Sequence, residues 1–241
     1  MTSQSKSEYT RSSRATPAPG APHTLTLALA QVVLALDDSR SMAENQCGAL
    51  ALEALTCIAR AMSRLEVGEL GVLSFGGAAG RGVRTLHPLG APFSDAAGPA
   101  LVSAFSFAGE HTVADSPVGA LLDTLDAQLG AAREAHVGGS EQLQQLVLVI
   151  ADGHFHEKES LRIRMRRLER RGLLVAFIAL DPGQTLLNMQ SVSFAGGKPL
   201  FSSYLDSFPF PFFTIVSEVA TLPRTLCDLL RQWFEVTGRA D

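Results

Sequence analysis

The chain has 241 residues, of which 46% are hydrophobic and 18% are charged. This apolar content is enough to form a sizeable core, which excludes disorder for most of the chain. The 20 basic and 24 acidic residues give a net charge of −4. Residues 1–24 contribute +2 through Lys6, Arg11 and Arg14 against Glu8, which leaves −6 for the remainder. We therefore expect no general binding of nucleic acid or of an anionic membrane.

The cysteines and the apolar runs limit the class of protein further. Cys47, Cys57 and Cys227 are widely spaced and form no C-x-x-C pair, which argues against a disulfide framework or a zinc site and for a reducing compartment. The longest apolar run, Leu25–Leu36, has 12 residues, whereas a membrane span needs about 20. Residues 1–23 are rich in Ser, Thr, Pro, Ala and Gly, and we interpret them as a flexible linker or leader, with a transit peptide as the alternative.

Strand-like and helix-like patterns alternate along the rest of the chain. Continuous apolar runs of strand length indicate buried strands, and apolar residues at helical spacing indicate amphipathic helices. In chain order, the patterns predict a strand at 25–36, a helix at 43–65, a strand at 70–75, an edge strand at 82–87, helices at 98–106 and 117–135, a strand at 146–151, a helix at 157–171, a strand at 173–180, an irregular insert at 181–207, a strand at 212–216 and a last helix through 219–233.

This alternation predicts an α/β fold in which helices cover both faces of a doubly wound, mostly parallel sheet. We expect residues 24–241 to form it as one domain. In such folds ligands bind outside the carboxyl ends of the strands, near the point where the strand order reverses. The places to look are therefore the loops that follow Leu36 and Ala151.

Oxygen-bearing side chains occur in both loops. Asp37, Ser39 and Ser41 form a D-x-S-x-S pattern after the first strand, and Asp152-Gly153 follows the strand at 146–151. Alternate side chains of a short extended loop point to one side, so the first three can converge on one cation. Oxygen ligands of this kind suit Mg²⁺, with Mn²⁺ as a possibility. The competing interpretation is that one of the two serines caps the next helix.

The order of these residues resembles the metal-ion-dependent adhesion site, or MIDAS, of von Willebrand factor A domains. The stretches LALDDSRSM, VLVIADG, YLDSFPFPFFTIV and LPRTLCDLLRQWFEV further resemble the C-terminal MIDAS domain of the midasin family, whose members are very large AAA ATPases of ribosome assembly. The resemblance covers roughly residues 30–236. It implies a von Willebrand factor A-type fold, and it implies the metal ligands position by position: Asp37, Ser39, Ser41, Thr112 and Asp152.

Other residues beside the metal loops receive roles from the same resemblance. Asp38 does not match a ligand position, and we expect it to be a solvated carboxylate or one that supports the ligands. The side chains that flank the metal loops either form a rim that touches the partner or only cover the loop backbone; they are Glu110, His111, His154 and Phe155.

The resemblance implies a protein-binding module that depends on Mg²⁺. The implied partners are ubiquitin-like domains of WD-repeat ribosome assembly factors, and through them precursors of the large ribosomal subunit. A carboxylate of the partner would complete the coordination of the metal, so that the ATPase motor can remove the factor. This function implies a nuclear location, in the nucleolus or nucleoplasm, with no membrane and no direct nucleic acid as partner.

An enzyme is the alternative class, in the form of a Mg²⁺-dependent phosphatase-like hydrolase that uses Asp37 and Asp152. Phosphatases of the haloacid dehalogenase type need D-x-D, and Ser39 occupies the second position here. A Ser-His-Asp hydrolase would need a G-x-S-x-G elbow, and an ATPase would need G-x-x-x-x-G-K-[ST]; the sequence contains neither motif. We therefore expect the chain not to be an enzyme.

Two further stretches admit two interpretations each. The arginine-rich segment 157–171 is either a solvated helix face or a nuclear-localisation or RNA-contact patch. The stretch SFPFPF at 207–212 is either an exposed aromatic recognition strip or a segment that packs its phenylalanines against the sheet. Cys47 shares a helical stripe with Ala51 and Leu55, so we expect it in the core.

Overall fold

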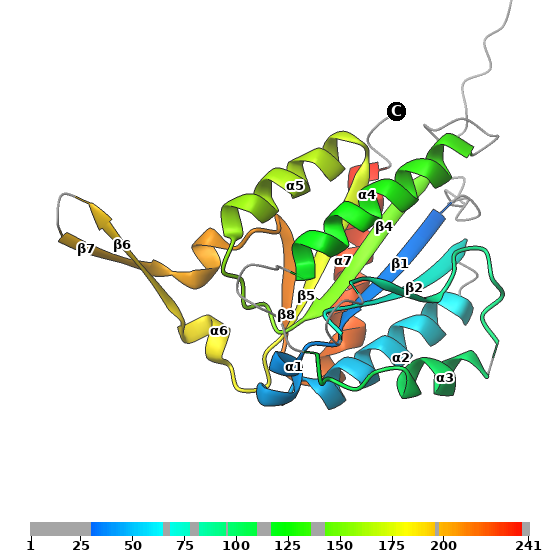
Figure 1. Cartoon of the computed structure of the whole chain (residues 1–241), viewed down its shortest axis with the longest axis horizontal. Coiled ribbons are helices and arrows are strands. Elements are labelled where there is room, and N and C mark those ends of the chain that lie inside the picture. The colour runs from blue at the N-terminus through cyan, green and yellow to red at the C-terminus, as the bar shows by residue number, and fades with distance from the viewer. Residues whose placement is uncertain are drawn as a thin grey trace, which may run out of the picture.

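The structure is a computed structural model, and its account of the chain covers residues 30–64, 68–77, 82–94, 96–109, 117–135, 143–195 and 198–237. Helices lie on both sides of a central sheet, and a thin two-stranded hairpin projects from one end (Figure 1). Residues 1–23, interpreted from sequence as a linker or leader, lie outside the described residues, as do residues 25–29 of the first predicted strand.

The sheet has six strands in the order β3-β2-β1-β4-β5-β8. Every neighbouring pair is parallel except β2 and β3, which are antiparallel. The chain adds strands outward on one side from β1 to β3 and on the other from β4 to β8, so the order reverses between β1 and β4. The predicted doubly wound fold is therefore confirmed. The strands are β1 (Ala30–Asp37), β2 (Glu69–Phe75), β3 (Arg84–His87), β4 (Gln144–Ala151), β5 (Leu173–Leu180) and β8 (Phe212–Val216).

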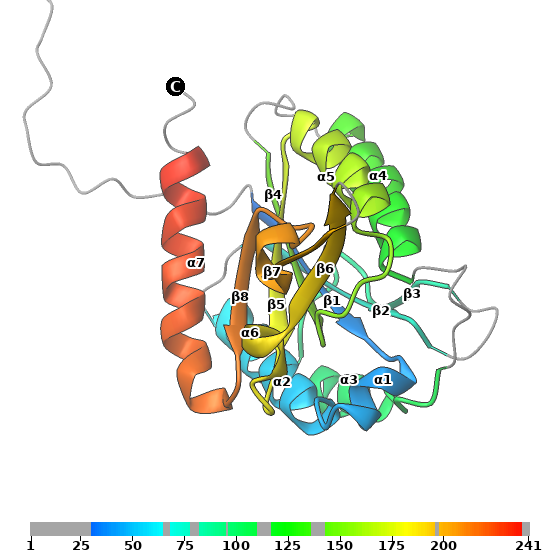
Figure 2. The same cartoon turned by 90° about the vertical axis from the view of Figure 1, so that its left-hand side faces the viewer.

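The helices form two layers. α4 and α5 pack together on one face, whereas α2 and α7 cover the other, and α3 lies beside α2 (Figures 1 and 2). The stripe that predicted the first long helix is buried, as is Cys47 just ahead of it. The helices are α1 (Arg40–Glu44), α2 (Gly48–Arg64), α3 (Ala97–Ser103), α4 (Pro117–Ala135), α5 (Lys158–Arg170), α6 (Thr185–Asn188) and α7 (Leu222–Thr237), with short 3-10 helices η2 (Tyr204–Ser207) and η3 (Val219–Thr221). None of the helices in the described part of the chain has the length and apolarity that crossing a membrane requires.

The helix expected over 43–65 is in fact two helices. Gln46 adopts a left-handed conformation with φ of 58°, which ends the turn of α1 before α2 begins. A side chain in this conformation is uncommon outside turns, and nothing in the apolar pattern signals it. The short helix α1 therefore stands apart at the carboxyl edge of the sheet.

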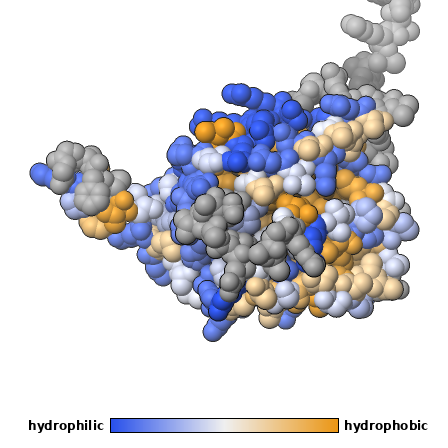
Figure 3. Space-filling model, viewed as in Figure 1, coloured by the Kyte–Doolittle hydropathy of each residue, from blue (hydrophilic) through white to orange (hydrophobic). Residues whose placement is uncertain are grey.

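The segment 181–207 was expected to be an irregular insert, and that expectation is wrong, because its described part contains regular secondary structure. It contains α6, the antiparallel hairpin of β6 (Gln190–Ala195) and β7 (Lys198–Ser203), and then η2. Val192, Leu200 and Phe201 of this hairpin are each more than half exposed, and an apolar patch is visible near its end (Figure 3). Ser191 and Ser193 alternate with Val192 and Phe194 in β6, but β7 (KPLFSS) has no such alternation, so the sequence pattern does not reveal the pairing.

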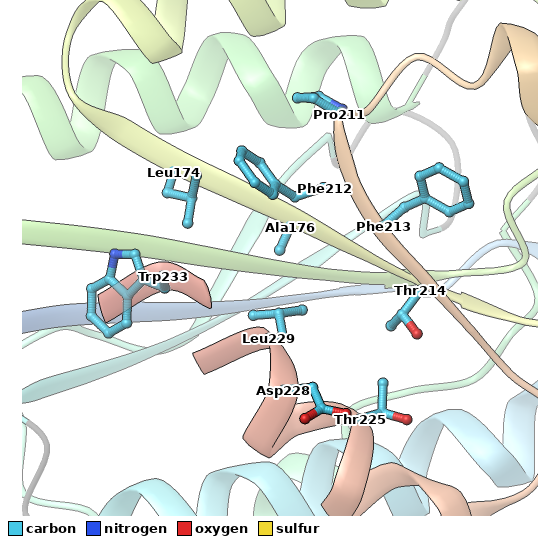
Figure 4. A pocket seen from close by; sticks show the side chains of 10 residues that line it. All are labelled: Leu174, Ala176, Pro211, Phe212, Phe213, Thr214, Thr225, Asp228, Leu229 and Trp233. Carbon is cyan, nitrogen blue, oxygen red and sulfur yellow. The ribbon is translucent and has the colours of Figure 1, made fainter. Parts of the chain in front are cut away.

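The SFPFPF stretch packs inward. Phe208 and Phe210 are buried, and the ring centroids of Phe210 and Phe177 are 4.7 Å apart. The interpretation as packing is therefore confirmed for these two rings. A pocket of about 240 Å³ lies between α7 and the amino-terminal half of β5, with Leu174 and Trp233 in its lining (Figure 4). This pocket lies away from the carboxyl edge, because Leu174 is near the amino end of its strand.

The arginine-rich segment forms α5, and several of its side chains pair with α4. Arg164 and Arg167 both contact Asp123, at 3.1 and 2.6 Å, and Arg171 contacts Asp126 at 2.7 Å. The surface over this part of the molecule is strongly hydrophilic (Figure 3). Part of the basic charge on the helix is thus neutralised within the domain.

Candidate metal centre at the carboxyl edge of the sheet

The residues singled out from sequence lie where the strand order reverses. Asp37 is the last residue of β1, and Asp152 directly follows β4, its hydrogen-bonded neighbour. Both strands run in the same direction and end beside α1 (Figure 1), so Asp37 and Asp152 both lie at the carboxyl edge of the sheet. Both are buried, with 5% of each residue exposed.

The loop after β1 turns sharply around its first aspartate. Asp37 Oδ1 accepts a hydrogen bond from the backbone N–H of Ser39 at 2.8 Å. The hydroxyls of Ser39 and Ser41 lie 2.9 Å apart. Ser39 occupies the N-cap position of α1, yet its side chain makes no capping hydrogen bond. The capping interpretation is therefore wrong for Ser39, and its hydroxyl faces the site instead.

Asp38 is an anchor for this loop. It is 2% exposed, and its Oδ1 atom accepts hydrogen bonds from the backbone N–H groups of Ser106 at 2.8 Å and Phe107 at 2.7 Å. Its Oδ2 atom lies 3.3 Å from Nη2 of Arg84. Of the two roles expected for Asp38, the solvated one is wrong, and the supporting one is confirmed.

The segment that leads to the second predicted loop is also tied to the first. Ser39 and Gly109 form an isolated parallel bridge, and the N–H of Arg40 donates to the carbonyl oxygen of Gly109 at 2.7 Å. A Cβ atom on Gly109 would lie 2.1 Å from the carbonyl oxygen of Gly76, so only glycine fits this approach. Glu110, His111 and Thr112 follow immediately and lie outside the described residues.

The loop after β4 is held by partners from elsewhere in the chain. Asp152 Oδ2 accepts a hydrogen bond from the side-chain amide of Asn45 at 3.0 Å, and its Oδ1 atom accepts one from the N–H of His154 at 3.2 Å. The side chain of Ser41 also lies close enough to this carboxylate to lower its pKa, so Ser41 is near both aspartate loops. The structure thus brings together four of the five predicted ligands: Asp37, Ser39, Ser41 and Asp152.

The two carboxylates have opposite protonation preferences. Burial raises the pKa of Asp37 to about 7; the hydrogen bond from Ser39 opposes this shift, and the charge of Asp152 adds to it. Burial also acts to raise the pKa of Asp152, but contacts with His154 and Ser41 outweigh it and leave the pKa below its usual value. In turn, the carboxylate of Asp152, 3.7 Å from Nδ1 of His154, raises the pKa of that imidazole.

These donors fit a hard divalent cation. They are two carboxylates and two hydroxyls, all oxygen, which is the chemistry that Mg²⁺ and Mn²⁺ prefer. Within the described ranges no three His, Cys, Asp or Glu side chains cluster so as to hold a metal, so a cation here takes hydroxyl oxygens as well as carboxylates. A buried carboxylate with a raised pKa is also a group that a nearby positive charge would stabilise in its ionised form.

The expected partner rim is only partly described. His154 follows the metal loop, and its side chain is 33% exposed. Phe155 is half-buried and packs edge-on against Phe177 and Phe208, with ring centroids 5.2 and 5.3 Å apart. This ring therefore supports the loop from inside, and a contact of either residue with a partner stays a prediction.

Sequence reasoning missed two residues that hold the site. Asn45 binds the carboxylate of Asp152 across 107 residues of chain, and the hydroxyl of Tyr204 hydrogen-bonds to the backbone on both sides of His154. Neither residue belongs to a ligand pattern. Tyr204 does open the YLDSFPFPFF stretch that carried the resemblance, which was the one available signal.

Comparisons with known proteins agree with this geometry. No protein-family model matches the chain. It is 35% identical over 211 residues to midasin of Dictyostelium discoideum and 34% identical over 211 residues to midasin of Giardia intestinalis, covering 86% and 85% of this chain. The chain spans only 3% and 4% of the length of these two relatives.

Among solved structures, the chain resembles the manganese-loaded TRAP protein of Plasmodium vivax, with a TM-score of 0.56, 16% identity, and coverage of 86% of this chain and 74% of that one. The chain therefore has the fold of a von Willebrand factor A-type domain, and its sequence is similar to a small part of two midasins.

Proposed function

We propose that the domain is a protein-binding module that depends on a divalent metal ion. Asp37, Ser39 and Ser41 would hold the ion, with Thr112 and Asp152 completing the protein's share of the ligands. The observation that carries the proposal is the convergence of two buried aspartates and two hydroxyls that face the site at the switch point of the sheet. The manganese in the similar TRAP protein supports a divalent cation such as Mg²⁺ or Mn²⁺ at this site.

The donor set favours a receptor over a catalyst. Two ionised carboxylates only just balance the charge of a divalent cation. Mg²⁺ also keeps several exchangeable waters when protein ligands are few. The ion would supply open coordination positions to a carboxylate of the partner. The chain's own residues shape that event: Asp38 and Asn45 fix the two loops, and Ser41 lies near both.

The partners that this function takes are ubiquitin-like domains of WD-repeat assembly factors, bound to precursors of the large ribosomal subunit. The similarity to two midasins supports this choice. The domain would act in the nucleus and transmit to such a factor the pulling force of an ATPase motor in the longer protein. The partner contributes one Glu or Asp, and the interaction depends on that side chain.

The hydrolase alternative gains nothing from the geometry. The hydroxyls of Ser39 and Ser41 lie 2.9 Å apart, and each interacts with one carboxylate: Ser39 with that of Asp37 and Ser41 with that of Asp152. Such shared contacts are typical of metal ligands rather than of a nucleophile and its base. A screen with common phosphoesters in Mg²⁺ distinguishes the two classes, because the proposal predicts no turnover.

The deciding experiment is isothermal titration of a ubiquitin-like domain into this chain. We expect binding in Mg²⁺, and we expect its loss with EDTA, with Asp37→Ala, and with replacement of the partner's acidic residue. Each change should cost about 2 kcal/mol or more of binding free energy, as the loss of a hot-spot residue does. Pairs of these changes should be far from additive, because all act through one ion. Tight binding that persists in EDTA would move the interface away from the metal.

A further inference from the structure

The insert that follows β5 is connected directly to the loop that carries Asp152. Tyr204, the first residue of η2, is buried, and its hydroxyl donates to the carbonyl oxygen of Gly153 at 3.0 Å. The same oxygen accepts a hydrogen bond from the backbone N–H of Phe155 at 2.8 Å. One phenol therefore holds the two peptide groups that flank His154, directly after Asp152.

The insert holds this tyrosine firmly. The backbone N–H of Tyr204 donates to the carbonyl oxygen of Met189, which closes the base of the β6–β7 hairpin. The ammonium group of Lys158 lies 3.4 Å from the centre of the phenol ring and donates to the hydroxyl of Ser207 at 2.6 Å. Ser203 caps η2 in a reciprocal capping box with Asp206. The position of the phenol is thus set by the insert, from both the hairpin and the 3-10 helix.

The loop needs this external support. Gly153 has a φ of 77°, a conformation that favours glycine, and a Cβ atom there would lie 3.1 Å from Leu186 of the insert. The carbonyl of Gly153 and the N–H of Phe155 take the same hydroxyl as their partner. Removing that hydroxyl would leave two backbone groups in need of new partners, so the loop would relax.

We propose that Tyr204 is a positioning residue that sets the Asp152 loop and couples the hairpin insert to metal binding. This inference rests on the proposed metal-dependent function. Because coupling between two sites is reciprocal, a cation that fixes the Asp152 loop also stabilises η2 and the base of the hairpin. The insert is then part of the metal site's support rather than an independent appendage.

The first test compares two conservative variants by titration with Mg²⁺. Tyr204→Phe removes only the hydroxyl and should weaken Mg²⁺ affinity about tenfold, the lower end of what loss of an outer-shell partner does to a metal site. Asn188→Ala is the matched control, because it removes an exposed hydrogen bond of the same insert, to the carbonyl oxygen of Gln184, without touching Tyr204 or the Asp152 loop. Its Mg²⁺ affinity should stay within about twofold of the wild type, since the loop keeps its outer-shell partner.

Hydrogen exchange on the wild type provides a second test that needs no variant. Saturating Mg²⁺ should slow exchange at the amides of Phe155 and Tyr204 together, while amides in the far half of the hairpin serve as the internal reference. Equal Mg²⁺ affinity in wild type and Tyr204→Phe would overturn the coupling while leaving the proposed function intact, as would unchanged exchange at Tyr204. A wild type that binds no Mg²⁺ would instead overturn the proposed function itself.

Discussion

The loops that carry Asp37 and Asp152 leave neighbouring strands at one edge of the sheet, yet they are held in different ways. The first is anchored within the domain's body by Asp38, whose carboxylate binds two backbone amides. The second is held by Asn45 and, through its backbone, by Tyr204 of the insert. The pKa values of the two ligand carboxylates are also shifted in opposite directions.

This difference gives the two carboxylates separate roles. Asp152 has a lowered pKa and is a fixed negative charge at neutral pH. Asp37, with a pKa of about 7, is protonated in about half of the metal-free molecules at that pH, so its ionisation is linked to cation binding. Two carboxylates in one site thus have roles that their environments set, as in many enzyme centres.

The largest expected effect separates the two aspartates by stability. Asp37→Asn and Asp152→Asn should both abolish measurable Mg²⁺ binding, because each removes a ligand charge. The raised folded-state pKa of Asp37 means that its ionised form destabilises the fold, with stability lost as pH rises from the unfolded value of 3.8 to about 7. Asp37→Asn should therefore raise the free energy of unfolding of the apo protein at pH 8, by on the order of 1–3 kcal/mol.

Asp152→Asn should have the opposite effect on stability. A lowered folded-state pKa contributes stability above the unfolded value, which is lost as pH falls through the folded one. At pH 8 the variant should lose about 1.5–3 kcal/mol, the net contribution of a hydrogen bond to a charged acceptor. Chemical denaturation in EDTA measures both variants. Global unfolding of Asp37→Asn would show that Asp37 is a structural residue rather than a ligand.

The second prediction concerns pH. Because Asp37 must lose its proton to bind a cation, Mg²⁺ affinity should fall about tenfold per pH unit below 7 and level off above it. His154 beside Asp152 also has a raised pKa, so the control is His154→Gln, which should retain the slope. Titrations between pH 5.5 and 8 measure the slope, because this range extends roughly 1.5 pH units below and one above the pKa of Asp37. A flat profile in the control would mean that Asp37 is already ionised or does not bind the metal.

The third prediction tests the loop outside the described residues. Thr112→Ala should weaken Mg²⁺ affinity about tenfold, because it removes one hydroxyl ligand. Thr124→Ala is the matched control, since that hydroxyl donates to the carbonyl of Ala120 within α4, at an exposed position. Equal affinities in the two variants would remove Thr112 from the ligand set.

The smallest effect concerns the insert and leaves global stability unchanged. The β6–β7 hairpin is a separate two-stranded sheet, and such a hairpin is only marginally stable. Its amides should exchange faster than those of β4, which is buried and paired on both sides. Native-state hydrogen exchange measures the contrast. Protection in β6 equal to that in β4 would show that the insert is as rigid as the sheet.

The sequence predicted the parts of the site that depend on local order. Continuous apolar runs located β1 and β4, and the rule for doubly wound sheets then placed Asp37 and Asp152 together. For Asp38 the sequence left two roles open, because the choice between them depends on a contact with a segment 68 residues away. The same holds for Asn45 and Asp152, which are 107 residues apart.

The prediction for the insert at 181–207 failed for a different reason. β6 alternates serines with Val192 and Phe194 but has only 6 residues, and its partner β7 (KPLFSS) shows no alternation. The pairing of these two strands leaves several apolar side chains exposed. A pattern that looks for a buried face cannot detect a hairpin without one. The contact of Tyr204 with Gly153 is likewise tertiary and has no periodic signature.

Crystals of this domain grown with Mn²⁺ provide the most direct test of the central claim, that the carboxyl edge of the sheet holds a divalent cation. An anomalous difference map places the ion without any assumption about its ligands. The account predicts one strong peak within coordination distance of the hydroxyls of Ser39 and Ser41, on the side that faces Asp37 and Asp152, with a free position toward solvent. A peak elsewhere, or no peak at this edge in Mn²⁺-saturated crystals, would contradict it.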